Sequence, residues 1–183
     1  MIVDCNETTV NTMLPGTSLI LGFRYKGTTT YLTDRENILP FAVVAGMRKS
    51  IQLMKDETST GNLLVVFNTE GAAAFFKEPL HYTFGEVLSL GEFSNFKKLN
   101  ELEDKLCDVE TNKQRVDIIE RFLLTMVYDF KQDQLIAHAV QIIKRHNGFI
   151  KIKELATKLF ISLDAFEKRF RKQWGLRQNS FVI

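Results

Sequence analysis

The sequence is poor in the residues that form disulfides and metal sites. It has two cysteines and three histidines among 183 residues. Cys5 and Cys107 lie far apart and form no ligand spacing, which is typical of reduced thiols in a cytosolic protein. The three histidines, His81, His138 and His146, fall on different predicted elements and share no metal-ligand spacing. We therefore expect neither a bound metal nor a cofactor.

Long hydrophobic runs and the short motifs of common enzymes are also missing. The longest apolar stretches, such as Leu63 to Phe67, are far shorter than a membrane span. Residues 1–30 lack the basic start and apolar run of a signal peptide. No GxSxG, HExxH or glycine-rich phosphate loop occurs in the sequence. These absences predict a cytoplasmic protein with no membrane partner and no enzymatic activity.

Charge is distributed unevenly along the chain, although the net charge is only +2. Residues 142–183 hold 10 Lys and Arg against 3 Asp and Glu, a balance of +7. Residues 1–141 hold 14 against 19, a balance of −5. A basic end on a weakly acidic body indicates a polyanionic partner for that end. The alternative is a charged helix face that only contacts water.

Residues 1–70 have the composition of short strands separated by turns. β-Branched and aromatic residues dominate several runs, and the residues between them include the turn formers Pro, Gly, Asp and Asn. The expected strands cover residues 17–25, 28–33, 41–45, 50–55 and 63–67. Several short strands at this spacing predict a small antiparallel sheet or an open, half-cupin-like barrel.

Helical patterns dominate after residue 70. Residues 70–77 predict a short helix that ends before Pro79, and residues 84–92 predict a turn or a second short helix. Apolar residues then recur every three or four positions, over 94–106, 111–130 and 135–143. The predicted fold class is therefore α+β. The expected domains are a β-rich sensor over 1–92, a helical linker or dimerisation region over 93–130, and an all-α region over 131–183.

The basic end has the pattern of short helices joined by a tight turn. His146-Asn147-Gly148 predicts the end of one helix, because Gly favours the left-handed cap. Residues 153–159 predict the next short helix, and Ser162 is placed to cap a third helix that runs from residue 163 to about residue 173. Phe166 and Phe170 are expected to face inward on that helix. Two short helices of this kind, the second one basic, predict a helix-turn-helix.

The second helix of such a motif enters the major groove, so its exposed side chains meet base edges and phosphates. We predict that Lys168 donates to guanine and that Glu167 accepts from a cytosine amine. Phosphate contacts, which add affinity without sequence information, are expected from Arg169, Arg171, Lys172 and, with the helix N-terminus, Ser162. The alternative is a helical hairpin that only packs.

Residues 152–175 match a known 24-residue pattern at every fixed position. The pattern is I-x-x-L-A-x-x-[LVIF]-x-[LIV]-S-x-x-x-[LF]-x-[RK]-x-F-[KR]-x-x-x-G, and it is met from Ile152 through Ser162 to Gly175. In this the segment resembles the first helix-turn-helix of AraC-type transcription regulators, the AraC/XylS family. The resemblance implies double-stranded DNA as the partner, with Asp164, Glu167 and Lys168 facing the groove. Two of these three are acidic and repel phosphates, which implies selective rather than strong base reading.

The resemblance extends to the earlier part of the chain with less specific residues. Residues 64–80, then Leu88-Ser-Leu90 and the helices up to Tyr128, are similar to the effector-side domain of an AraC subgroup. Leu14-Pro15 and Gly46 stand where such domains begin and end a strand. This likeness implies a domain that senses a small-molecule effector or forms a homodimer. For the effector we expect an apolar pocket lined by Phe and Tyr side chains of the strands.

The sequence after Gly175 limits the DNA binding that the resemblance implies. AraC-type modules carry two helix-turn-helix units bridged by a long helix, and residues 176–181 resemble the opening of that bridge. No second unit follows, so we expect a truncated module. One unit makes few phosphate contacts, and therefore we expect weak DNA binding. The alternative function is a sensor or dimerisation module that does not bind DNA and whose helix-turn-helix is vestigial.

Overall fold

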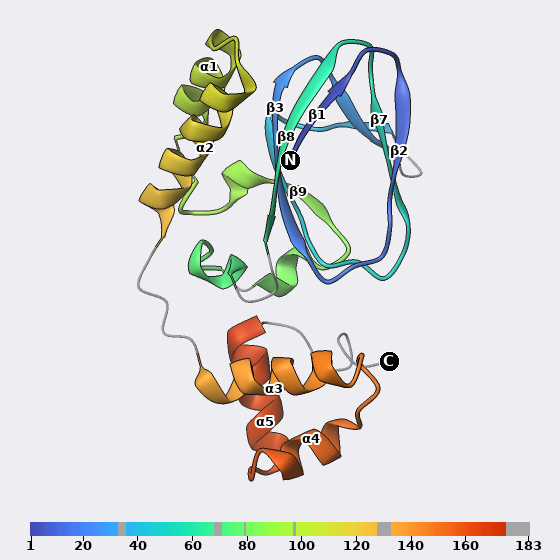
Figure 1. Cartoon of the computed structure of the whole chain (residues 1–183), viewed down its shortest axis with the longest axis vertical. Coiled ribbons are helices and arrows are strands. Elements are labelled where there is room, and N and C mark those ends of the chain that lie inside the picture. The colour runs from blue at the N-terminus through green and yellow to red at the C-terminus, as the bar shows by residue number, and fades with distance from the viewer. Residues whose placement is uncertain (33–35, 68–70, 79, 97, 128–132, 175–183) are drawn as a thin grey trace. The chain divides into compact units, whose positions relative to one another are not determined.

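The computed structural model describes residues 1–32, 36–67, 71–78, 80–96, 98–127 and 133–174, and it does not describe the side chains of His81 and residues 172–174. The chain divides into two compact units. The first unit comprises Met1–Glu78 with Thr83–Tyr128, and the second comprises Pro79–Tyr82 with Asp129–Ile183. Figure 1 draws the chain from blue at its start to red at its end.

The described strands of the first unit form two antiparallel sheets. They are β1 Ile2–Cys5, β2 Thr9–Met13, β3 Leu19–Lys26, β4 Thr29–Leu32, β5 Glu36–Ile38, β6 Ala42–Ala45, β7 Gln52–Asp56, β8 Thr60–Phe67 and β9 Val87–Ser89. One sheet has the order β1-β8-β3-β6-β9, and the other has the order β2-β7-β4-β5. The two sheets face each other in Figure 1, with β3 and β8 on one side and β2 and β7 on the other. The fold class is therefore α+β, as predicted.

Four of these strands, β1, β2, β5 and β9, were not predicted from the sequence. All four lie at sheet edges, where a strand has one hydrogen-bonded neighbour and less buried surface. The residues of β5 are all exposed, and those of β2 are exposed or half-buried. An edge strand of this kind lacks the apolar alternation that reveals a strand in sequence. The expected turn or helix over 84–92 is therefore wrong in part, because it contains β9.

Alternation along β3 explains how the first unit is layered. Leu21 and Phe23 are completely buried on one face of the strand, while Ile20, Gly22 and Arg24 point to the other face. The Phe23 ring meets the ring of Phe122 edge-on at 6.4 Å between centroids. Phe122 belongs to a helix, so one face of this sheet packs on helices and the other looks into the space between the sheets.

Two helices cover that outer face: α1 (Leu99–Asp108) and α2 (Asn112–Met126). Their buried residues are Leu102, Leu106, Ile119 and Leu123. Thr111 begins α2 with a capping box, in which its hydroxyl and the side chain of Gln114 each bond the other residue's backbone N–H. Both helices belong to the first unit, so residues 93–127 pack with the β-rich part of the chain.

Arg115 joins these two helices to β3. Its guanidinium donates to the carbonyls of Leu106 at 3.3 Å and Glu110 at 3.1 Å, which lie at the end of α1. It also stacks over the Tyr25 ring, with the guanidinium carbon 4.2 Å from the ring centroid. Burial and the neighbouring Asp4 carboxylate, which accepts from the phenol, raise the pKa of Tyr25 to about 12. The helical pair is thus held to the sheet by polar contacts as well as by its apolar stripe.

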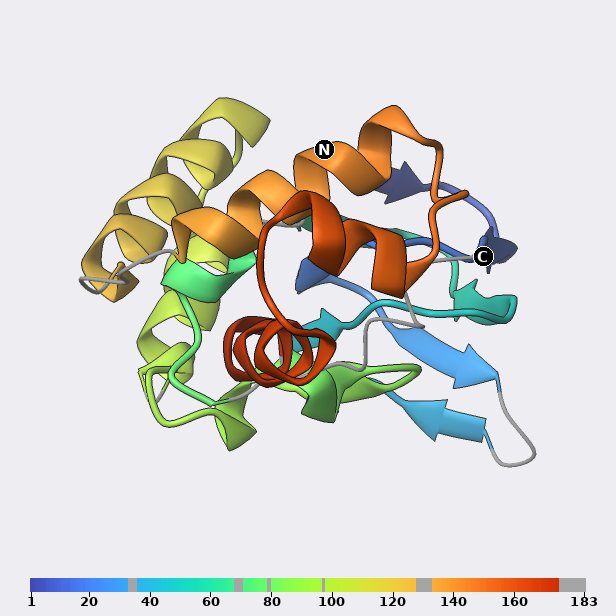
Figure 2. The same ribbon diagram turned by 90° about the horizontal axis from the view of Figure 1, so that it is seen from below.

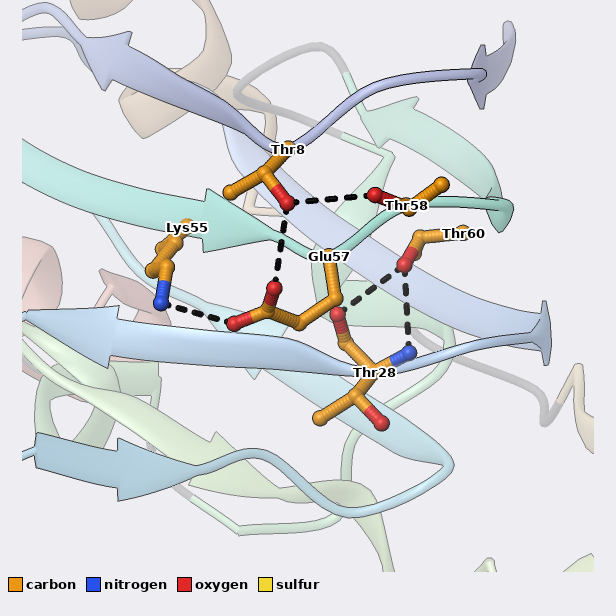
Figure 3. A network of polar contacts seen from close by, with 6 residues as sticks. All are labelled: Thr8, Thr28, Lys55, Glu57, Thr58 and Thr60. Carbon is orange, nitrogen blue, oxygen red and sulfur yellow. Dashed lines mark hydrogen bonds and ion pairs between the residues drawn. The ribbon is translucent and has the colours of Figure 1, made fainter.

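A network of polar contacts closes one end of the sheets (Figure 3). Thr60 Oγ1 donates to the Thr28 carbonyl at 3.0 Å and accepts from the Thr28 N–H at 3.1 Å. Glu57 accepts from Thr8 Oγ1 at 3.2 Å and pairs with Lys55 Nζ at 2.7 Å. These bonds tie together the turns between β1 and β2, β3 and β4, and β7 and β8.

Short 3-10 helices replace the helix that was expected over residues 70–77. The structure has η1 at Ala72–Ala74, η2 at Leu80–Thr83 and η3 at Leu90–Glu92. Around η1, Phe67 and Phe75 meet at 4.9 Å, and Ala72, Ala73 and Phe76 are buried. Ala72, Ala73 and Phe76 are all buried, and their spacing does not fit the single apolar face of an amphipathic helix. The helix predicted over residues 70–77 is therefore wrong in extent.

In the second unit the described α-helices pack around one small core: α3 (Gln134–Arg145), α4 (Ile152–Lys158) and α5 (Leu163–Trp174). Its buried residues are Ile136, Ala139, Val140, Ile143, Ile150, Leu155, Ala156, Phe166 and Phe170. Figure 2 looks along α5 and shows α3 passing across it. The helix ends follow the sequence prediction at residues 146–148, where Asn147 and Gly148 have φ of 50° and 82°.

Candidate functional site

Helix α5 has one apolar face and one polar face. Phe166 and Phe170 are completely buried, and their ring centroids lie 5.6 Å apart. Ser162 caps the helix, since its Oγ accepts from the Ala165 N–H at 3.2 Å and its carbonyl accepts from the Phe166 N–H at 3.0 Å. The cap and the inward phenylalanines are both as predicted.

The turn before α5 contains an unusual residue. Phe160 has φ of 54°, and its side chain is 96% exposed. Its N–H bonds the Thr157 carbonyl, and the next N–H, that of Ile161, bonds the Ala156 carbonyl, both at 3.1 Å. This is the Schellman motif that ends many helices, with Phe at the position where Gly is usual. The motif fixes the direction in which the chain enters α5.

The predicted DNA-contacting residues lie mostly on the open side of α5. Asp164, Glu167, Lys168 and Arg171 are spaced by three or four residues and so share one face, away from Phe166 and Phe170. Three of them are exposed and Glu167 is half-buried. Ser162 is exposed at the start of the helix, and the side chain of Lys172 lies outside the described residues. This face carries two acidic and two basic groups.

Arg169 forms an ion pair within the second unit. Its Nε donates to Asp133 Oδ2 at 2.7 Å, across the unit from α5 to α3. The other oxygen of Asp133 caps α3 by accepting from the N–H groups of Leu135 at 3.0 Å and Ile136 at 3.3 Å. Sequence analysis did not find this pair, because nothing local links residues so far apart. Arg169 therefore has a structural contact in addition to the phosphate role expected from the sequence.

The first unit contains a cavity of about 500 Å³ between its two sheets. Its middle is lined by apolar residues of both sheets, among them Ile20, Val43, Met54 and Leu64. A side chain at Gly22 would begin only 3.1 Å from Val43 Cγ2, so the glycine leaves room there. The sequence predicted a lining of Phe and Tyr. Among the described residues Phe41 is the one aromatic in the lining, so that detail is wrong.

One end of this cavity is formed by a buried carboxylate with several donors. Asp56 is 4% exposed. Its Oδ1 accepts from Thr29 Oγ1 at 2.5 Å and Asn62 Nδ2 at 3.0 Å, and its Oδ2 accepts from Asn11 Nδ2 at 2.8 Å. These partners come from β4, β8 and β2, so the Asp56 network joins the two sheets. Arg24 lines the same end and donates to the Leu39 carbonyl at 2.7 Å.

The other end of the cavity carries Arg48. It follows β6 and forms an isolated bridge with Gly16, ahead of β3. Its Nε donates to the Leu14 carbonyl at 2.9 Å, and its Nη1 donates to the Gly46 carbonyl at 3.3 Å. Burial lowers the pKa of the Arg48 guanidinium. No carboxylate of the described residues pairs with it.

A second hollow, of about 710 Å³, lies between α1 and α2. It is lined by apolar residues such as Leu102 and Phe122 and by both signs of charge, including Lys105, Asp108 and Arg121. Because its lining carries both signs of charge, this hollow does not favour a ligand of one charge. The two helices that form this hollow belong to the region over 93–130 for which the sequence predicts a linker or dimerisation role.

The described residues contain no group of three or more His, Cys, Asp or Glu side chains able to hold a metal ion. None of the described helices has the length and hydrophobicity needed to cross a membrane. The candidate sites are therefore the exposed face of α5 and the cavity of the first unit.

Comparisons with known proteins give a limited likeness. No protein-family model matches the chain, and no curated protein matches it. Among solved structures it is similar to ToxT of Vibrio cholerae. An apo point variant of ToxT shares 9% identity over 99% of this chain and 95% of that chain, with a TM-score of 0.38. Wild-type ToxT with a bound unsaturated fatty acid shares 13% identity over 100% and 94%, with a TM-score of 0.32. At these values the likeness does not assign a family.

Proposed function

We propose that this chain is an AraC-type transcription regulator in which α5 reads DNA and the first unit holds a small-molecule effector. One observation carries the DNA-binding part. Within the segment that matches the AraC pattern, the fixed apolar positions Leu155, Ala156, Phe166 and Phe170 are buried, while Asp164, Lys168 and Arg171 on the other face of α5 are exposed. A helix held by its apolar face and open on its polar face suits insertion into a major groove.

The residues of the open face have distinct roles in this proposal. Lys168 reads guanine, and Arg171 holds a phosphate. Asp164 and Glu167 repel phosphates, so they weaken binding to most sequences and favour sites that offer a cytosine amine. Ser162 already bonds the first turn of α5, which leaves other N–H groups there for a phosphate. We therefore propose selective but weak binding by this chain.

The salt dependence of DNA binding tests this proposal. We expect the full chain to bind a labelled duplex of mixed sequence at low salt, with an affinity that falls steeply as salt rises, measured by fluorescence anisotropy. Arg171→Ala removes one phosphate contact, so the slope of log K against log salt should become shallower by about 0.9. Lys105→Ala removes the same charge from α1 and should leave the slope unchanged.

The alternative is a sensor or dimerisation module that does not bind DNA. It is favoured by the two carboxylates, Asp164 and Glu167, on the face that would meet the duplex. An absence of binding at low salt, or an equal effect of Arg171→Ala and Lys105→Ala, would favour this alternative. The cavity of the first unit could then still hold an effector.

A further inference from the structure

The large apolar residues of α5 differ in their burial. Phe166 and Phe170 are completely buried in the core of the second unit. Leu163, the first residue of the helix, is 41% exposed and is not one of the buried residues of that core. A single exposed leucine is common on protein surfaces, so its exposure alone indicates no function. The position of Leu163 on α5 is the second observation.

Leu163 lies next to the residues that are predicted to read bases. It precedes Glu167 by four residues, so the two side chains are neighbours on one side of the helix, and Asp164 follows it directly. The cap fixes this start of the helix, because Ser162 Oγ accepts from the Ala165 N–H at 3.2 Å. Leu163 is therefore held at the end of α5 that a recognition helix presents to base edges.

Charge changes sign along the open face of α5. The first half of this face carries the carboxylates of Asp164 and Glu167, and the second half carries the cations Lys168 and Arg171. Phosphates attract the basic half and repel the acidic half, so the acidic half is best placed over base edges and away from the backbone. Leu163 stands beside both carboxylates, and therefore it meets base edges in the same arrangement.

The apolar group on the base edges of the major groove is the C5 methyl group of thymine. The hydrogen-bonding groups of those edges would lose water against a leucine without gaining a partner. The neighbouring Glu167 carboxylate adds a second condition, because it accepts from an exocyclic amine, which adenine and cytosine carry. Together Leu163 and Glu167 favour a thymine methyl group that lies close to such an amine.

We propose that Leu163 determines sequence specificity by packing on a thymine methyl group in the major groove, close to the amine that binds Glu167. This inference rests on the proposed DNA-binding function. It adds a residue that the sequence analysis did not select and the chemical group that this residue recognises. The preferred duplex should then lose affinity when that methyl group is removed.

Deoxyuridine tests this expectation, because it lacks the C5 methyl group of thymidine and keeps the same base pairing. The full chain first selects its tightest duplex from a random pool at low salt. We expect the same duplex with deoxyuridine at every thymidine to bind about fourfold more weakly by fluorescence anisotropy, as the burial of one methyl group implies. Substitution at one position at a time should localise the loss to one thymine for each bound chain. Equal binding of the two duplexes, or a loss spread evenly over all positions, overturns the proposal.

Three variants connect the methyl preference to Leu163. Leu163→Ala removes most of the apolar side chain and keeps a good helix former, so this variant should bind the two duplexes equally. Leu163→Met keeps an apolar side chain of similar volume and should keep the preference. Leu124→Ala makes the same change at a leucine of α2 that is 72% exposed, and it should also keep the preference. A preference that survives Leu163→Ala overturns the proposed contact. If that variant does not fold, Leu163→Gln gives the same test with another good helix former.

The outcomes separate this inference from the function on which it rests. DNA binding itself is measured by its salt dependence. A chain whose binding falls steeply with salt but is equal with and without the methyl groups refutes only this inference. A chain that binds no duplex at low salt refutes the proposed DNA binding and this inference together.

Discussion

At the scale of single residues, two side chains stand in positions that their type does not favour. Phe160 adopts a left-handed backbone conformation at the end of α4, and it is almost fully exposed. For a residue with a Cβ, that conformation costs about 1–2 kcal/mol relative to the right-handed one. Arg48 lies partly buried without an acidic partner among the described residues. By general physical rules each feature is unfavourable for the folded state.

Phe160→Gly should therefore stabilise the second unit. Glycine adopts positive φ without steric cost, and the exposed ring loses little buried surface, so we expect a gain of about 1 kcal/mol in the free energy of unfolding. Thermal or urea denaturation of the full chain measures it. The control is Phe149→Gly, which removes a phenylalanine that is 71% exposed but is not among the residues with positive φ. That change should be destabilising, and a loss of stability in both variants would contradict the strain argument.

At the scale of helices and strands, local signals predicted the second unit better than the first. Ser162 and the spacing of Phe166 and Phe170 lie within one helix and its cap, so the sequence alone predicted them. The edge strands β1 and β2 depend on distant partners, β8 and β7, and carry little apolar pattern of their own. The same holds for the candidate sites, since the exposed face of α5 was predicted while Arg48 and the Arg169 pair were not. Each of those depends on residues brought together only by folding.

The Arg169 to Asp133 pair gives a test at this scale. Because the pair holds α5 to the start of α3, Arg169→Met should destabilise the second unit by up to about 1 kcal/mol, as expected for a half-exposed ion pair. Asp133→Ala should cost more, roughly 1–2 kcal/mol, since it also removes the cap of α3. Chemical denaturation of both single variants and the double variant measures the coupling.

DNA binding separates this structural role of Arg169 from the phosphate role. A positioning residue should lower affinity without changing the salt slope, and Asp133→Ala should act in the same way. If Arg169→Met makes the slope shallower by about 0.9 while Asp133→Ala does not, Arg169 binds a phosphate directly.

At the scale of the whole molecule, the chain divides into two compact units. The first has its core among the sheets, α1 and α2, and the second has its core among α3, α4 and α5. The acidic balance of residues 1–141 and the basic balance of residues 142–183 nearly follow this division. We therefore expect each unit to have its own stability.

Calorimetry of the full chain should accordingly resolve two unfolding transitions. Gly46→Ala should lower the free energy of unfolding of the first unit alone, by at least about 3 kcal/mol. The reason is that its Cβ would lie 1.8 Å from the Thr83 carbonyl oxygen. Gly16→Ala is the control, since a Cβ there meets nothing nearer than 3.9 Å. Phe160→Gly should move only the other transition. A single transition that shifts with every variant would mean that the two units unfold together.

The absence of a side chain at Gly22 affects the size of the cavity in the first unit. The room between the sheets exists partly because β3 leaves one inward position empty, next to Val43 and Leu64. A methyl group added at Gly22 would shorten the space between the sheets, and a smaller side chain at Val43 or Leu64 would lengthen it. The strand pairing would stay the same. Exchanges of small aliphatic residues at these positions would change the size of the cavity without altering any residue of α3, α4 or α5.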